Sequence, residues 1–209
     1  MAAFRRRTLR ATLTLAFALA AGIVADSRAA SDLLPAAEIR PAAAGTAPRV
    51  VGQQTRQGQP VLLGSRMASG PGSGIRFSLL DGSVVIIGPN SVVSVDEFAQ
   101  DRVVLTVERG AFYLDSANPG AVHVVLPTGT VAVRTATVAG RIGLNGTEVA
   151  LLSVGRAEVT GFGGDSVRLD QIGQATRIIG LGSPSQPATL TPQRLQDFTG
   201  LPSQIVRRD

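Results

Sequence analysis

The sequence predicts an all-β fold, either a two-layer sandwich of jelly-roll type or a short β-solenoid, with one short C-terminal helix. Two observations support this prediction. Apolar and polar residues alternate over short runs, as at Val103, Leu105 and Val107, which share one face of an expected strand. Turn residues also recur at intervals of about eight to twelve residues, which is typical of many short strands.

The strand pattern continues through the centre of the chain. Val122, Val124 and Leu126 alternate with other residues around His123, and residues 131–133 repeat the pattern. The four apolar residues at 84–87 leave no polar face, which indicates a strand that is covered on both sides.

Turn signals separate these expected strands. Asp-Gly and Asn-Gly pairs between apolar runs favour hairpin turns, because both central positions of a type I′ turn need a positive φ. Turns are expected at Asp81-Gly82, Gly88-Pro89-Asn90, Arg109-Gly110, Pro119-Gly120, Thr128-Gly129, Asn145-Gly146 and Gly155.

One helix is expected, at about residues 192–199, within a C-terminal tail formed by residues 180–209. A threonine cap followed by a proline in the first turn favours the start of a helix there. We expect this helix to dock through Leu195 and Phe198.

The N-terminal segment, residues 1–30, has the pattern of a signal peptide. Arginines precede an uncharged run that ends at Ala25 and is too short for a comfortable membrane span. Cleavage is expected after Ala29, with Ala25 or Ala30 as alternatives, and an uncleaved amphipathic anchor is the other interpretation. The general secretory and twin-arginine routes both stay open. Residues 31–47 are expected to form a flexible linker, and the protein is expected to be periplasmic or secreted.

The basic residues are concentrated in that export segment. All 20 basic residues are arginine, and the 15 that follow the segment are nearly balanced by 14 acidic residues. Only 4% of the residues are aromatic. The mature chain therefore lacks both a phosphate-tracking surface and stacking platforms, and we exclude a nucleic-acid partner.

Two absent residue types exclude further functions. Without cysteine the chain has no disulfide framework, thiolate zinc site, thiol nucleophile or lipoprotein anchor. Without lysine it has no Walker-type phosphate loop and no Schiff-base amine. No cofactor is expected.

No residue is assigned a catalytic, cofactor-binding or metal-binding role, and the protein is expected not to be an enzyme. His123, the only histidine, fits a structural or surface position within a strand better than a ligand or a catalytic base. Asp96, Glu97 and Asp101 are expected on a loop after Val95, where their spacing lacks the pattern of a calcium loop.

Other acidic residues are also expected to be structural. Asp81 is expected in a turn, and Glu108 and Glu148 at strand ends, although a pair of glycosidase carboxylates stays open.

Two loops are the candidates for a partner surface. Gly70–Gly74 and Asp96–Asp101 are expected to be exposed and long enough to be functional. The glycine-rich loop differs from a phosphate loop because a strand pattern, and no helix, follows it.

Five consecutive blocks carry a family resemblance. They are an Asp-Gly-Ser strand pair at 77–91, an aromatic-bearing strand block at 104–114, strand pairs at 122–133 and 148–159, and a Gly-Gln ending at 167–174. In this order they resemble the FecR domain, the periplasmic β-rich module of iron-citrate-type signalling regulators. The resemblance covers roughly residues 50–175. It implies a FecR-type β-domain at 48–179 with a role in signalling or envelope assembly.

Two features depart from the family. Where the family usually has Gly-Thr-x-Phe, this chain has Thr135-Ala136-Thr137-Val138, which puts an interaction of that strand in doubt. Only about ten residues precede the apolar run, whereas the full regulators begin with a cytoplasmic segment that handles a sigma factor. A stand-alone exported form is therefore expected, with no membrane span after signal cleavage.

The leading hypothesis is a non-enzymatic exported binding module whose partner is another envelope protein. The resemblance implies the signalling domain of an outer-membrane transporter as one such partner, bound by strand addition. A structural or adhesive protein that self-associates or binds cell-wall polysaccharide is the alternative, with residues 84–87 as an exposed edge. A hydrolase would need His123 and carboxylates gathered in one pocket.

Overall fold

The computed structural model describes residues 49–54 and 58–200. The chain divides into two units, Met1–Leu33 and Leu34–Asp209, and every described residue belongs to the second. The predicted signal peptide, its cleavage site and the predicted linker all lie outside the described residues.

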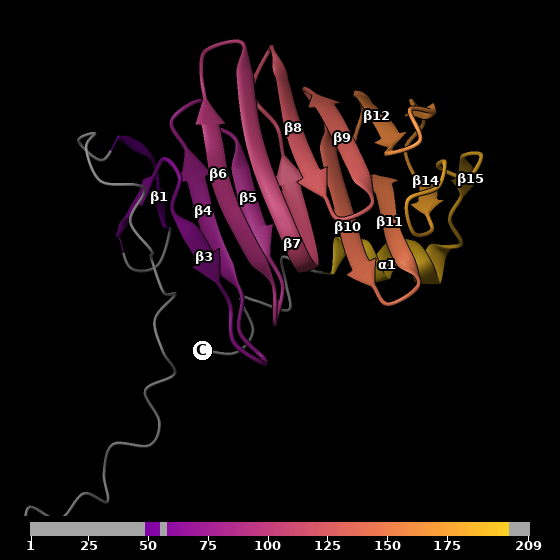
Figure 1. The fold of residues 1–209 in the computed structure, drawn as a ribbon, viewed down its shortest axis with the longest axis horizontal. Helices are drawn as coiled ribbons and strands as arrows, with labels where there is room; N and C mark the ends of the chain where they lie inside the picture. Colours follow the sequence, from indigo (N-terminus) through magenta and orange to yellow (C-terminus); the bar gives the residue numbers. More distant parts are fainter. Residues whose placement is uncertain (1–48, 55–57, 201–209) are drawn as a thin grey trace, which may run out of the picture. The chain divides into compact units, whose positions relative to one another are not determined.

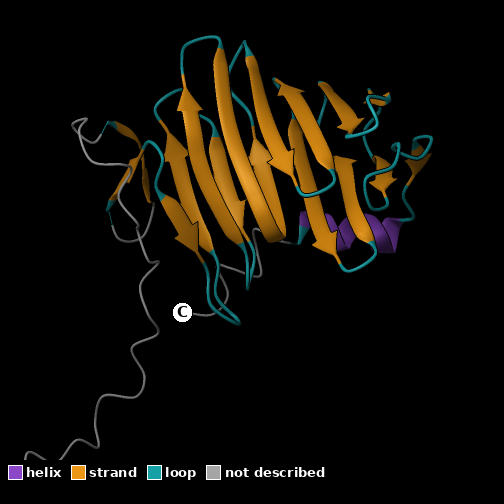
Figure 2. Cartoon of the chain, in the orientation of Figure 1, coloured by secondary structure: helices purple, strands orange, loops and turns teal. Residues whose placement is uncertain are grey.

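The described residues form 15 strands and one helix, which confirms the predicted all-β fold with a short C-terminal helix (Figure 2). Hydrogen bonds connect all the strands into one network, which is folded into two sheets. Sheet A contains, in order, β3 (Arg66–Ala68), β6 (Val92–Phe98), β7 (Arg102–Asp115), β8 (Ala121–Leu126), β9 (Gly129–Arg134), β12 (Arg156–Gly161) and β13 (Ser166–Leu169).

Sheet B shares β7 with sheet A. In order, it contains β2 (Pro60–Leu62), β1 (Val50–Gln54), β4 (Ile75–Leu79), β5 (Val84–Ile87), β7, β10 (Thr137–Gly143), β11 (Gly146–Leu151), β14 (Gln174–Ile178) and β15 (Ala188–Thr189). Beyond β7 the hairpins alternate between the sheets, since β8–β9 and β12–β13 lie in sheet A and β10–β11 in sheet B (Figure 1). Among the described strands, the pair β7–β8 is parallel and every other pair is antiparallel.

The strand β7 belongs to both sheets because it bends at Gly110. Residues 102–109 pair in sheet A with β6 and β8, and residues 110–115 pair in sheet B with β5 and β10. Gly110 has a φ of 91°, and a Cβ there would lie 2.0 Å from Oγ of Ser91, so the position requires glycine. The predicted turn at Arg109-Gly110 is wrong, because the chain stays strand-paired on both sides of the bend.

The other predicted turns lie between strands or at their first residues. Asp81-Gly82 connects β4 to β5, and Asn145-Gly146 connects β10 to β11. Both glycines have positive φ, of 86° and 119°, as a hairpin turn of this kind requires.

One hydrophobic core lies between the two sheets. Val103, Leu105 and Val107 face it from sheet A, and Phe112 and Leu114 face it from the same strand beyond the bend. The alternation predicted for residues 102–108 is therefore confirmed. Because one strand supplies both layers, the two sheets share a single buried interior.

The predicted strand at 84–87 is confirmed as β5, which lies between β4 and β7. Val85 and Ile87 face the shared core, and Ile86 is buried on the opposite side. The alternative that this strand is an exposed edge is wrong, because β5 is hydrogen-bonded to a neighbouring strand on each side.

The predicted helix is α1 (Pro192–Thr199), which packs against sheet B (Figure 1). Phe198 is 3% exposed and packs on a set of small side chains, so the helix approaches the sheet closely. That set is Ala111, Ala139, Ala150 and Ala175. Leu195 is half-buried. Among the described residues, no helix has the length and apolar character needed to cross a membrane.

Candidate binding surface

His123 lies on the outer face of sheet A, in register with Val104 on β7 and Ala132 on β9. Burial first, and then the nearby cations Arg102 and Arg134, lower the pKa of the imidazole. Within the described ranges, no three histidine and acidic side chains are grouped so that they could hold a metal ion. His123 therefore lies within a strand, as predicted, and is partly shielded from solvent.

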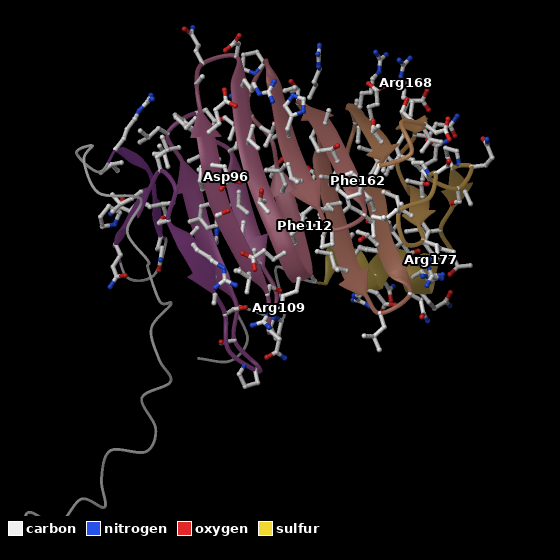
Figure 3. The ribbon with its side chains drawn as sticks, viewed as in Figure 1. Asp96, Arg109, Phe112, Phe162, Arg168 and Arg177 are labelled. Carbon is white, nitrogen blue, oxygen red and sulfur yellow. The ribbon has the colours of Figure 1, made fainter. Side chains whose placement is uncertain are left out.

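Asp96 and Glu97 lie within β6, so the prediction that they belong to a loop is wrong (Figure 3 labels Asp96). The strand continues past Val95 because a bulge opposite β7 keeps it paired. Asp96 accepts hydrogen bonds from the hydroxyls of Ser94 and Thr106. Glu97 forms an ion pair of 3.1 Å with Arg102. Both carboxylates are therefore bound by side chains of the domain itself.

Asp81, another acidic candidate, also has hydrogen-bonding partners within the domain. Asp81 accepts hydrogen bonds from the backbone of Ser83 and the side chain of Asn118. Glu108 and Glu148 lie inside strands and not at their ends as predicted, because β7 continues beyond Glu108 and β11 begins before Glu148.

Each of these two glutamates has an arginine partner. Glu108 binds Arg66 through two contacts of 2.6 and 2.7 Å, and this hydrogen bonding lowers the pKa of the carboxyl. Glu148 accepts two contacts from Arg194 of α1. Both pairs tie distant parts of the chain together.

The two loops predicted as partner surfaces lie at opposite ends of β6. Gly70–Gly74 adjoins Asn90, before the strand, and the turn that contains Asp101 follows its end. A seven-residue strand separates them by roughly 20 Å. The structure therefore does not combine them into one surface.

A shallow cavity of about 300 Å³ lies between α1, β14 and β15. The ion pair of Arg194 with Glu148 lines it, together with Arg177, which Figure 3 labels. The charges of Arg194 and Glu148 neutralise each other, and their ion pair connects α1 to sheet B. The cavity is therefore explained by the docking of α1 on this sheet.

The two sheets have four edge strands among the described residues, and β13 is the longest of them. β2 begins with Pro60, β15 has two residues, and β3 has three and carries Arg66, whose guanidinium binds Glu108. Short length, proline and charge each protect an edge from pairing. β13 has four residues and no proline, and its one charged residue, Arg168, lies in register with Glu158 of β12.

The backbone of β13 directs hydrogen-bonding groups outward. The Gly161 N–H donates to the Asp165 carbonyl at 3.0 Å, which identifies these two residues as a hydrogen-bonded pair. Such pairs alternate along an antiparallel ladder. The N–H and C=O groups of Ser166 and Arg168 therefore point away from β12, and no described strand pairs with them.

Exposed apolar side chains flank this edge. Phe162 in the preceding turn is 58% exposed, and Ile172 after the strand is 54% exposed. Val167, on the core side of β13, is half-buried. We call β13 together with Phe162 and Ile172 the open edge (Figure 3 labels Phe162).

The sequence predictions missed the open edge. One signal was present, since Phe162 is a rare aromatic residue placed beside Gly163 and Gly164. A large apolar side chain within a glycine-rich turn lies outside the strand pattern that builds the core, which favours an exposed position where it can contact a partner.

We compared the chain with protein families, curated proteins and solved structures. The model of the family described as FecR protein matches residues 65–159. Two crystal structures of a candidate anti-sigma factor from Parabacteroides distasonis ATCC 8503, at 1.65 and 2.50 Å resolution, share the fold with a TM-score of 0.53 at 16% and 15% identity. The similarity covers 63% of this chain and 62% of theirs, which is less than two thirds of their length. No curated protein matches the chain.

Proposed function

We propose that this chain, whose residues 65–159 match the FecR family, is a non-enzymatic regulatory module of the bacterial envelope that binds another protein by strand addition. The family match and the anti-sigma-like fold support a signalling or regulatory role. The proposed periplasmic or secreted location rests on the signal-peptide pattern of residues 1–30.

The observation that carries the proposal is the open edge at β13. An added strand would pair with the outward N–H and C=O groups of Ser166 and Arg168. It would also cover Val167 at the margin of the core, and its side chains would contact Phe162. Backbone hydrogen bonds supply affinity in this mode of recognition, and side-chain contacts supply specificity.

The partner class we propose is an envelope protein that presents an extended segment. The signalling domain of an outer-membrane transporter is one member of this class, in keeping with the FecR resemblance. Self-association through the same edge is the alternative, because two copies of β13 could also pair with each other.

A proline placed on the edge tests this proposal. Arg168→Pro removes an outward N–H but leaves the β12–β13 ladder, whose bonds use Val167 and Leu169. Arg168→Ala is the matched control, because it removes the side chain and keeps the N–H. The tagged full-length protein is used to recover partners from its own cell envelope, with mass spectrometry of the bound proteins.

We expect one envelope protein at near-equal stoichiometry with the wild type and Arg168→Ala, and its loss with Arg168→Pro. Equal recovery with both variants would show that the edge is not the binding surface. Recovery of the protein alone, as an oligomer that Arg168→Pro dissociates in size-exclusion chromatography, would establish self-association instead.

A further inference from the structure

Three arginines form one row across the outer face of sheet A. Arg102 lies on β7, Arg134 on β9 and Arg156 on β12, with Ala121 of β8 between the first two. Each arginine is next to a buried residue that faces the core, so the alternation of the strand directs the arginine to the outer face. We call these three residues the arginine row. Arg168, which Figure 3 labels, lies on the neighbouring strand β13.

The row contains an uncompensated like-charge pair. Arg134 and Arg156 are directly opposite each other on neighbouring antiparallel strands. Like charges in this arrangement repel and destabilise a sheet. Within the described ranges, neither guanidinium has a hydrogen bond or an ion pair, whereas Arg102 is paired with Glu97.

The nearest acidic side chain on β12 does not relieve this repulsion. Glu158 lies in the next row, in register with Arg168 of β13, and accepts a hydrogen bond from Ser166. Asp170, the residue after β13, continues the register opposite Arg156, but among the described residues no ion pair joins the two. The positive charge of Arg134 and Arg156 therefore stays available to a group from outside the domain.

The fold holds the two arginines together despite their repulsion. Arg134 is followed by Thr135, which has a φ of 45°, and Arg156 is preceded by Gly155, which has a φ of 139°. A Cβ on Gly155 would lie 2.4 Å from the carbonyl oxygen of Thr135, so the two turns pack backbone against backbone. This contact fixes the spacing of the arginines before any ligand arrives.

We propose that the arginine row binds an acidic segment of a partner protein, whose side-chain carboxylates lie between the guanidinium groups. Guanidinium binds carboxylate through two parallel hydrogen bonds, which suits adjacent arginines. The row spans three strand spacings, roughly 14 Å, a length that an extended segment of about five residues can follow.

The charge distribution favours a protein segment over a membrane surface. The described residues contain as many acidic side chains as arginines, so the domain has no broad positive field of the kind that an anionic bilayer attracts. The positive charge is instead confined to a narrow line with small residues such as Ala121 and Ala132 beside it. This surface is distinct from the open edge at β13, so the inference stands even if strand addition fails.

His123 provides a local reporter of binding. It is the only histidine of the chain. It lies in the cross-strand row adjacent to the arginine row, between Val104 and Ala132. Arg102 and Arg134 contribute to its lowered pKa. A carboxylate bound at the arginine row offsets this field, so the imidazole pKa rises toward its ordinary value.

The test is a titration of the purified full-length protein with a hexaglutamate peptide, with hexaglutamine as the neutral control. Calorimetry gives the affinity, and NMR of the imidazole gives the pKa of His123 with and without peptide. The row variant is Arg134→Gln/Arg156→Gln. The matched control, Arg76→Gln/Arg177→Gln, removes two exposed arginines from sheet B. Circular dichroism verifies that both variants are folded.

We expect hexaglutamate to bind in a salt-dependent manner, to raise the pKa of His123, and to bind the row variant about tenfold or more weakly than the control variant. Absence of binding, or equal weakening in the two variants, would overturn the inference. So would binding of phosphatidylglycerol vesicles that depends on Arg134 and Arg156 when hexaglutamate does not bind.

Discussion

At the residue scale, Thr135 stands out because its backbone is strained. It has a φ of 45°, and Asn90, at 53°, is the other non-glycine residue with positive φ among those described. Asparagine tolerates this region, but a β-branched residue does not. The FecR resemblance places a glycine at the position of Thr135, so the chain departs from the family at a point where glycine suits the backbone.

Thr135→Gly is therefore expected to raise the free energy of unfolding by about 1 kcal/mol, because it removes the left-handed strain. Asn90→Gly is the control and should produce a smaller gain, since asparagine is less strained there. Urea denaturation measures both. A loss of stability in Thr135→Gly, or an equal gain in both variants, would show that Thr135 is not strained.

His123 also makes stability depend on pH. Its pKa is lowered in the folded protein, chiefly by burial, so the unfolded chain binds the proton more readily. The free energy of unfolding should thus fall as the pH drops below about 6.5, the ordinary pKa of histidine.

Urea denaturation of the wild type and His123→Gln between about pH 7.5 and 5.5 tests this expectation. The variant should lose less stability over this range. Glu108, whose lowered pKa contributes stability that is lost only in more acidic solution, does not interfere. Identical pH dependence in the two proteins would contradict the assignment to His123.

At the scale of elements, the bend in β7 organises the molecule. One continuous strand supplies residues 102–109 to sheet A and residues 110–115 to sheet B. The bend depends on Gly110, which combines a φ of 91° with close contact to Ser91. A hairpin would have placed both halves of this segment in one sheet, whereas the bend places them in two facing layers.

Gly110→Ala is expected to lower the free energy of unfolding by at least about 3 kcal/mol, because the new methyl group collides with Ser91 as well as straining the backbone. Gly164→Ala is a matched control, since Gly164 has a φ of 90° and open space around it. That variant should lose only about 1 kcal/mol from backbone strain. Chemical denaturation compares them, and equal losses would refute the steric argument.

At the scale of the whole molecule, the two sheets share one strand and one core, so they are expected to unfold together. Two single residues report on them separately. Tyr113 is the only tyrosine and lies in sheet B, and His123 is the only histidine and lies in sheet A.

The urea midpoint from tyrosine fluorescence should equal the midpoint from the imidazole NMR signal, as cooperative two-state unfolding requires. The fluorescence signal is unobscured because the chain has no tryptophan. Different midpoints would mean that one sheet persists without the other, and that β7 does not couple them.

The amino-acid sequence by itself determined the strand faces, most of the turns and the helix. Val103, Leu105 and Val107 share a face because strand periodicity is local, and Asp81-Gly82 forms a turn because its φ requirement is local. The order of such blocks also sufficed to identify the FecR family, which the match over residues 65–159 confirms.

The tertiary structure alone decided where those strands lie. Gly110 signals a change of direction whether the chain turns back in a hairpin or bends into a second sheet, and only pairing with distant strands distinguishes the two. For the same reason Asp96 was misplaced on a loop, because the pairing of Val95 and Glu97 with β7, which keeps Asp96 as a bulge within the strand, is not local.

The candidate surfaces depend on such long-range pairing throughout. An edge exists at β13 because no described strand adds to it, and Arg134 meets Arg156 because β9 and β12, which are separated by a whole hairpin of sheet B, become neighbours. Periodicity reveals which face of a strand a residue occupies, but the neighbour of that strand is set by how the entire chain buries its core.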